Sequence, residues 1–165
     1  RSSCQSNLKQ IGLGIMQYMQ DYEEKTPNAT VNLGWANQVR PYIKSTQIFQ
    51  CSSEKNSTPV QTDPKLTGYT DYFYNAQLNQ IPLAKFEEVS RVISAADGND
   101  GQENTNAAYA KTEVPPAWRT DTDSPSFRHL DYGNYLFLDG HVKSVKVERI
   151  STAWSKDDYF FQAPK

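Results

Sequence analysis

The N-terminal segment carries apolar side chains at the spacing of one helix face. Steps of three and four residues place them on a single stripe at the period of an α-helix. The stripe consists of Cys4, Leu8, Ile11, Ile15, Tyr18, Met19 and Tyr22. Gly12 and Gly14 each cost about 1 kcal/mol relative to alanine inside a helix, so this helix must be held by packing against the rest of the chain. Pro27 is expected to end it.

Shorter patterned segments follow the helix. Residues 34–43 predict a short helix or turn with three buried side chains. These are Trp35, Val39 and Tyr42. Residues 46–51 favour an extended segment that ends at Cys51. Residues 52–65 are rich in Ser, Thr, Pro and Asn, which is typical of a surface loop.

Two further segments predict strands. Residues 68–78 are rich in aromatic side chains, which pack well across strands. Residues 91–96 form a short apolar run that stops at the turn-forming cluster 97–101. Between the two strands, residues 82–89 favour a single helical turn. Residues 102–125 are polar and contain a Pro-Pro pair, so we expect a long surface excursion there.

The strongest hairpin signal lies near the C-terminus. Residues 132–138 and 141–147 predict two strands joined at Asp139–Gly140, a dipeptide typical of a type I′ turn. A two-residue loop of this kind pairs Leu138 with His141. Both faces of the hairpin then carry apolar side chains, so either both faces are covered or a bulge shifts the register.

The order of these elements, without an internal repeat, predicts one α+β domain of 165 residues. The net charge of −2 and the sequence pI near 5.7 do not predict binding to nucleic acid. No run of about 18 apolar residues, the length that spans a bilayer, occurs in the printed sequence.

Ionisable residues cluster around the hairpin. His129, Asp131 and His141 contain the groups needed for acid–base chemistry or a metal site. A straight strand separates the two histidines by about nine residues, or roughly 30 Å, whereas metal–ligand bonds are about 2 Å long. We therefore expect His129 to bond locally at the start of its strand and Asp139 to form the turn. A metal-dependent hydrolase at His129, Asp131 and His141 is the competing hypothesis.

Oxygen ligands also occur at close spacing in Asp97, Asn99 and Asp100, which makes them weak candidates for calcium binding. The loop does not match an EF-hand, because Gly101 occupies the place of the third ligand and no glutamate closes the loop. The sequence therefore predicts a plain turn and no metal or other cofactor.

Exposed tryptophans provide an alternative function. Trp118 and Trp154 could stack on sugars in a secreted carbohydrate-binding or surface-binding module. Because leucine and isoleucine are scarce, aromatic side chains are expected mainly to build the core.

The two cysteines, Cys4 and Cys51, are too few and too far apart for a zinc knuckle, and no C-x-x-C pair is present. They form either one disulfide or two buried thiols.

Several of these segments together resemble a known family. Residues 4–14, with Tyr18, Asp21, Tyr22 and Pro27 after them, resemble the helix of bacterial type IV pilin-like and pseudopilin-like proteins. The C-terminal part is similar to the prepilin group with the signature H-x9-DG, present here as His129, nine residues and Asp139–Gly140. Weaker similarities are found at residues 46–51, 72–75 and 95–97.

The resemblance implies a structural filament subunit, a pilin or pseudopilin of a type IV pilus-like or type II secretion-like filament, and not an enzyme. Residues 1–26 would be the C-terminal half of the pilin helix, and residues 27–165 a head domain with an antiparallel sheet against the helix. A cleaved leader and about 20 apolar residues would precede residue 1 and anchor the subunit in the inner membrane before assembly. The partners would be other subunits in a periplasmic or extracellular filament, while the chain by itself is expected to be monomeric.

The resemblance also assigns structural roles to single residues. The helix would dock on the sheet through Leu8, Ile11, Ile15 and Tyr18. Asp139 and Gly140 would set the hairpin, and His129 would anchor its first strand. An exported protein favours disulfides, so Cys4 and Cys51 would pin the helix to the head, a cross-link worth about 4 kcal/mol in the chain-entropy model.

Overall fold

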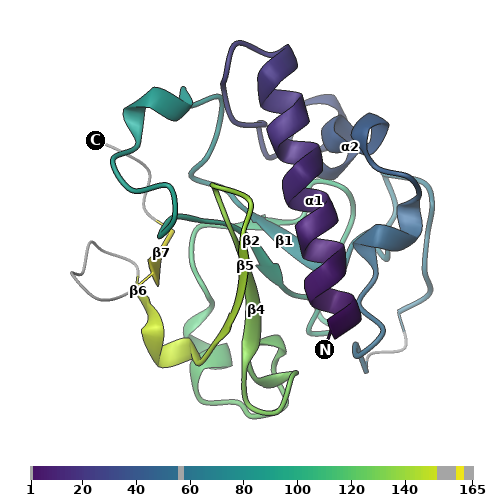
Figure 1. Cartoon of the computed structure of the whole chain (residues 1–165). Helices are drawn as coiled ribbons and strands as arrows, with labels where there is room; N and C mark the ends of the chain where they lie inside the picture. Colours follow the sequence, from purple (N-terminus) through teal and green to yellow (C-terminus); the bar gives the residue numbers. More distant parts are fainter. Residues whose placement is uncertain (1, 56–57, 152–158, 162–165) are drawn as a thin grey trace.

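A long N-terminal helix crosses one face of a five-stranded sheet (Figure 1). The computed structural model describes residues 2–55, 58–151 and 159–161. The helix, α1, spans Ser2–Asp21. The strands, in their order across the sheet, are β3 (Ala110–Lys111), β1 (Tyr72–Asn75), β2 (Ile93–Asp97), β4 (Gly133–Phe137) and β5 (Val142–Val145). The predicted α+β fold, with a helix packed on a mostly antiparallel sheet, is confirmed.

The pairings within the sheet are antiparallel except at one edge. The pairs β1–β2, β2–β4 and β4–β5 are antiparallel, whereas β1 and β3 are parallel. A separate parallel pair consists of β6 (Ile150–Ser151) and β7 (Tyr159–Phe160). The helix α2 covers Trp35–Val39. Short 3-10 helices span Val31–Leu33, Arg40–Tyr42, Thr46–Phe49, Leu83–Lys85, Pro116–Arg119, Pro125–Phe127 and Val147–Arg149.

The central strands are buried on both faces. Every residue of β1, β2 and β4 is buried, which explains why these strands are largely apolar or aromatic on both faces and do not alternate between apolar and polar residues. Tyr72 and Tyr74 belong to the core on the helix side, whereas Phe73 belongs to a second core on the opposite side. In the second core, Phe73 stacks on Phe161 at a ring-centroid distance of 5.8 Å.

The helix stripe is buried along most of its length, but the helix ends earlier than predicted. Tyr18 is 6% exposed, whereas Tyr22 lies beyond the last helical residue and is 51% exposed. The chain leaves the helix through Glu23 and Glu24, which adopt positive φ angles of 59° and 58°. Pro27 is therefore not the residue that ends the helix, because the backbone reverses before it. No helix in the described part of the chain combines the length and apolarity needed to cross a membrane.

Two expectations for the middle of the chain were wrong. Residues 46–51 are not extended, because Thr46–Phe49 forms a 3-10 helix that buries Phe49. Residues 102–125 are not merely a surface excursion, since they supply β3 and several buried side chains of the second core. These are Tyr109, Val114 and Trp118. Around residue 40, Trp35 and Val39 are buried as expected, while Tyr42 is only partly buried.

The β4–β5 hairpin has a three-residue loop instead of the predicted two-residue loop. Leu136 pairs with Val142, and the Phe137 N–H donates to the His141 carbonyl at 2.9 Å. The Gly140 N–H donates back to the Phe137 carbonyl at 2.8 Å, and Gly140 alone in this loop has a positive φ, of 94°. This arrangement matches a turn followed by a glycine bulge, so the register shift that the sequence left open is the one observed.

The same turn packs directly on α1. A Cβ atom added to Gly12 would lie 2.7 Å from Leu136 Cδ1 and 3.3 Å from the Gly140 carbonyl oxygen. A Cβ atom on Gly140 would lie 2.8 Å from the Met16 sulfur. The glycine in the helix, unfavourable for helix stability by itself, therefore permits the close approach of helix and hairpin.

Candidate functional site

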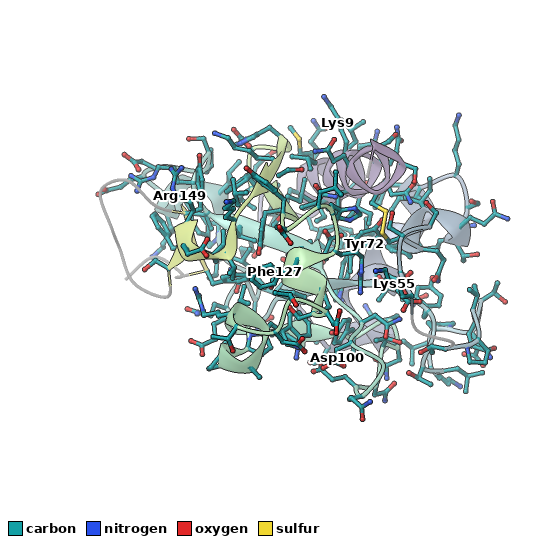
Figure 2. The ribbon with its side chains drawn as sticks, turned by 90° about the horizontal axis from the view of Figure 1, so that it is seen from below. Lys9, Lys55, Tyr72, Asp100, Phe127 and Arg149 are labelled. Atoms are coloured by element: carbon teal, nitrogen blue, oxygen red, sulfur yellow. A yellow bond between two sulfur atoms is a disulfide. The ribbon has the colours of Figure 1, made fainter. Side chains whose placement is uncertain are left out.

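A disulfide joins the first turns of α1 to the segment after the 3-10 helix Thr46–Phe49. Cys4 and Cys51 are bonded, with a Cα–Cα distance of 5.0 Å and a sequence separation of 47. Cys4 is 0% and Cys51 4% exposed. Figure 2 shows the disulfide next to α1, close to Tyr72. The cross-link that the resemblance implied is thus present in the structure, buried between helix and head.

His129 lies against this disulfide. Its Nε2 atom is 3.8 Å from Cys51 Sγ and 3.2 Å from Asp97 Oδ2, and the side chains of His129 and Asp97 are 1% and 2% exposed. The His129 backbone bonds locally, because its N–H donates to the Tyr132 carbonyl at 3.0 Å. The imidazole, however, makes its contacts with residues far away in the sequence, which the expectation of a local bond did not include.

Local backbone geometry turns His129 inward. Leu130 and Asp131, which follow it, have positive φ angles of 56° and 72°. Such angles are uncommon for residues other than glycine and mark a tight reversal of the chain. Leu130 is 81% exposed, so the reversal places an apolar side chain in solvent and the histidine in the core.

A second buried carboxylate supports the disulfide from the start of β1. Asp71 Oδ2 accepts the Cys51 backbone N–H at 2.8 Å, and Asp71 Oδ1 accepts the Asn99 side-chain amide at 2.8 Å. Burial raises the pKa of the Asp71 carboxyl above its ordinary value, although these two hydrogen bonds act in the opposite direction. Arg128 Nη2 donates to the Asn99 carbonyl at 2.9 Å and thereby closes the cluster.

Asn134 connects this cluster to the sheet and to the helix. Its backbone N–H donates to Asp97 Oδ2 at 2.7 Å. Its side-chain oxygen accepts the Ser144 hydroxyl, which in turn accepts the Gln5 amide of α1 at 2.6 Å. The disulfide, His129 and the side chains of Asp71, Asp97 and Asn134 thus meet where β1 and β4 begin and β2 ends. We call this group the polar end of the sheet.

The polar end is not fully hydrogen-bonded among the described residues. Asp97 Oδ1, Asn134 Nδ2 and Arg128 Nη1 are buried side-chain atoms without a hydrogen-bond partner in that part of the chain. Buried polar groups normally have partners because an unmade hydrogen bond costs about 1–3 kcal/mol. Because three such atoms belong to this one region, the polar end is the strongest candidate for a functional site in the described chain.

The calcium candidates do not share a common centre. Asp97 contacts His129, and Asn99 donates to Asp71. Asp100 accepts the Trp118 indole N–H at 3.2 Å. Their side chains therefore bind three different partners. The histidine, cysteine and acidic residues that the described chain brings within metal-binding reach are instead Cys4, Cys51 and His129.

The residues of the hydrolase hypothesis are not brought together either. His129 is buried, whereas Asp131 is exposed. His141 lies at the hairpin turn, where its side chain is 42% exposed and its Nδ1 pairs with Asp139. Among the described residues, His129, Asp131 and His141 do not form a group that could hold one metal ion.

Trp118 is not available as a sugar-stacking platform. It is 4% exposed and belongs to the second core, where its ring packs against Phe73 at a centroid distance of 6.0 Å. The alternative that required an exposed Trp118 is therefore contradicted, and Trp118 is core material, as expected for most of the aromatic side chains. Trp154 lies outside the described residues.

His129, Cys4 and Cys51 stand out in the sequence, but nothing there connects them with Asp71 and Asn134. A signal for both is present: Asp71 stands directly before an aromatic run, and Asn134 stands inside an otherwise uncharged, largely apolar strand. Isolated polar residues in such runs are expected to be buried, and buried polar groups require partners. Which partners they find depends on the strand order, which the sequence does not show.

Comparison with known proteins gives one result. A family profile described as "Protein of unknown function (DUF1559)" matches residues 1–86 of the 165. No curated protein and no solved structure matches. The matched range includes α1, both cysteines and β1, while His129 and the Asp139–Gly140 turn lie beyond it.

Proposed function

This chain belongs to the DUF1559 family, a family of bacterial surface and pilin-like proteins, and on that basis we propose that it is a structural subunit, a pilin or pseudopilin, of a type IV pilus-like or type II secretion-like filament. Its work is mechanical and not catalytic. Its partners are further subunits, and its place is the inner membrane before assembly and a periplasmic or extracellular filament afterwards.

The observation that carries the proposal is the position of the disulfide on α1. Cys4 lies in the first turns of the helix, and Cys51 belongs to the head. Tension applied to residues before α1 is transmitted directly to the head through the Cys4–Cys51 disulfide. Without this bond, the same pull would peel the helix from the sheet one turn at a time. A cross-link at this end of the helix suits a subunit that transmits force.

The outer face of the helix supports the same interpretation. Leu8 and Ile11 are 0% exposed, while Leu13 is 48% exposed and Met16, at the edge of the outer face beside Gly140, is 38% exposed. Leu13 and Met16 are three residues apart and therefore neighbours on the helix surface. A helix that serves only to cover a sheet has a polar outer face, whereas a helix that also packs against other subunits needs apolar contacts there.

The proposal requires an apolar segment before residue 1 in the full-length protein. The test is to read the gene upstream of Arg1 and to determine the mature N-terminus of the native protein. A short basic leader and about 20 apolar residues continuous with α1 are the expected result. A conventional signal peptide cleaved directly before residue 1 would contradict the proposal and leave a secreted soluble domain.

A second test addresses assembly. Leu13→Glu in the full-length protein should abolish recovery of filaments from the cell surface, because it places a charge in the proposed subunit contact. Lys85→Glu, exposed and outside α1, is the control and should assemble. Circular dichroism of the two soluble domains checks that both are folded. If a folded Leu13→Glu protein formed normal filaments, this result would contradict the proposed subunit contact at Leu13.

A further inference from the structure

Three metal-binding donor atoms converge at the polar end. Cys4 Sγ, Cys51 Sγ and His129 Nε2 all lie within 4.8 Å of one another. They come from three separate parts of the chain: α1, the segment after Thr46–Phe49, and the segment before β4. All three residues are buried. In the structure, the two sulfur atoms are bonded to each other, so the group is closed by the disulfide.

The spacing of the donors fits a tetrahedral metal site. Zinc binds sulfur at about 2.3 Å and imidazole nitrogen at about 2.0–2.1 Å, which places the two donors about 3.6 Å apart at a tetrahedral angle. The distance from Cys51 Sγ to His129 Nε2 is 3.8 Å. The imidazole therefore already stands where a metal ligand would stand. Only the two sulfur atoms need to separate, by rotation of their side chains.

The surroundings supply charge and a fourth donor. Two thiolates cancel the charge of a divalent ion, so the complex can be buried without a net charge. Asp97 Oδ2 is 3.2 Å from His129 Nε2, close to the roughly 3.3 Å expected between nitrogen and oxygen ligands of one tetrahedral zinc ion. Asp97 Oδ1 has no hydrogen-bond partner among the described residues. Asp97 is not among the donors that all lie within 4.8 Å of one another, so its carboxylate would have to move toward the sulfur atoms to take the fourth position.

We propose that the reduced form of this protein binds one zinc-class divalent metal ion through Cys4, Cys51 and His129, with Asp97 beside them. A thiol or phosphine reductant supplies two electrons to the disulfide, and two protons complete two cysteine thiols. The metal ion then displaces both protons, and His129 presents the Nε2 lone pair with its proton on Nδ1. Disulfide and metal are alternatives at one place, so α1 is cross-linked to the head under oxidising and under reducing conditions.

Cobalt(II) is the probe for the test, because thiolate ligands give it an intense charge-transfer absorption. The protein is reduced with a phosphine without oxygen and titrated with Co²⁺. The expected result is one equivalent bound with thiolate charge-transfer and tetrahedral d–d bands, and displacement by Zn²⁺. The oxidised protein should show none of these bands. His129→Gln should weaken binding at least about tenfold, whereas His141→Gln, on the exposed histidine, should bind as the wild type does.

Each other outcome overturns the proposal. A reduced protein that keeps its circular dichroism spectrum and binds no cobalt has no such site. Binding that is equal in His129→Gln and wild type involves the thiols without the histidine. If reduction unfolds the chain, one equivalent of Zn²⁺ should restore the native spectrum, and failure to do so is also decisive against the site. None of these results depends on whether the protein forms filaments.

Discussion

The two ends of the central strands are closed by different kinds of interaction. At the polar end, a disulfide ties α1 to the segment after Thr46–Phe49, and the buried His129 pairs with Asp97 at the end of β2 beside it. At the other end, which we call the turn end, the β4–β5 loop fits against α1 through Gly12 and Gly140 with no space for a Cβ atom. The interactions at the polar end depend on the orientation of donors and acceptors, and we expect their contribution to stability to change with reductant and pH. The turn end is steric and responds to side-chain volume.

Removal of the disulfide tests the polar end most strongly. Cys4→Ala with Cys51→Ala should lower the free energy of unfolding by about 4 kcal/mol, because the cross-link spans 47 residues and restricts the unfolded chain. Denaturant unfolding with a chelator present measures the loss without a contribution from metal. The reduced wild-type protein should match the double variant. An unchanged unfolding midpoint would show that the cysteines are not bonded in solution.

Substitution of the buried histidine should have the next largest effect. His129→Leu removes the imidazole that pairs with Asp97 Oδ2 in the core, although this oxygen keeps the Asn134 N–H, and the loss of one partner of a buried pair costs about 3 kcal/mol. His141→Leu, at the exposed turn, should stay within about 0.5 kcal/mol of wild type. Because the residues interact directly, combining His129→Leu with Asp97→Asn should cost less than the sum of the single losses. If the two losses in free energy of unfolding were strictly additive, the interaction between His129 and Asp97 would contribute nothing to stability.

The turn end should be less costly to disturb. Gly140→Val should lower stability by about 2 kcal/mol, since φ is 94° and a β-branched residue is strained there. Gly140→Asn should lose about half as much, because asparagine tolerates positive φ and only the contact with Met16 is disturbed. Thermal unfolding compares the two. Equal losses in both variants would assign the effect to volume alone.

The smallest expected effect is a pH dependence at the polar end that comes from Asp71. Burial raises the pKa of Asp71 above its ordinary 3.8, so the folded state holds this proton more firmly than the unfolded state. The stabilising contribution of Asp71 is complete below pH 3.8 and is lost as pH rises through the raised pKa. The free energy of unfolding of the wild type minus that of Asp71→Asn should therefore decrease as the pH rises. A difference that rises with pH would contradict this prediction.

The sequence predicted the elements whose signal is local. The stripe from Leu8 to Tyr18 fixed the face of α1, and the apolar runs located β1, β2 and the C-terminal hairpin. The early end of the helix was not predicted, because the residues with positive φ angles there are Glu23 and Glu24. A glycine or proline at these positions would have indicated a helix end. The hairpin loop was misjudged because Asp-Gly serves two-residue and three-residue loops alike.

The polar end could be predicted only in pieces. Local sequence patterns indicated Cys4, Cys51, Asp97 and His129 one at a time. The order of β1, β2 and β4 in the sheet brings these residues together. Calcium binding was considered for Asp97 because oxygen-rich neighbours are visible in the sequence, whereas its partner lies 32 residues away (129 − 97). Spacing along the chain excluded a zinc knuckle and gave no information about donors assembled from three segments.

The position of both cysteines before the first strand has a consequence for biogenesis. A chain is synthesised from its N-terminus, so Cys4 and Cys51 are both present before β1 begins at Tyr72. The printed sequence contains two cysteines, so one pairing between them is possible within it. This ring can therefore close on a chain that has no sheet yet. His129 lies further along the chain and packs against the bond once the segment before β4 is in place.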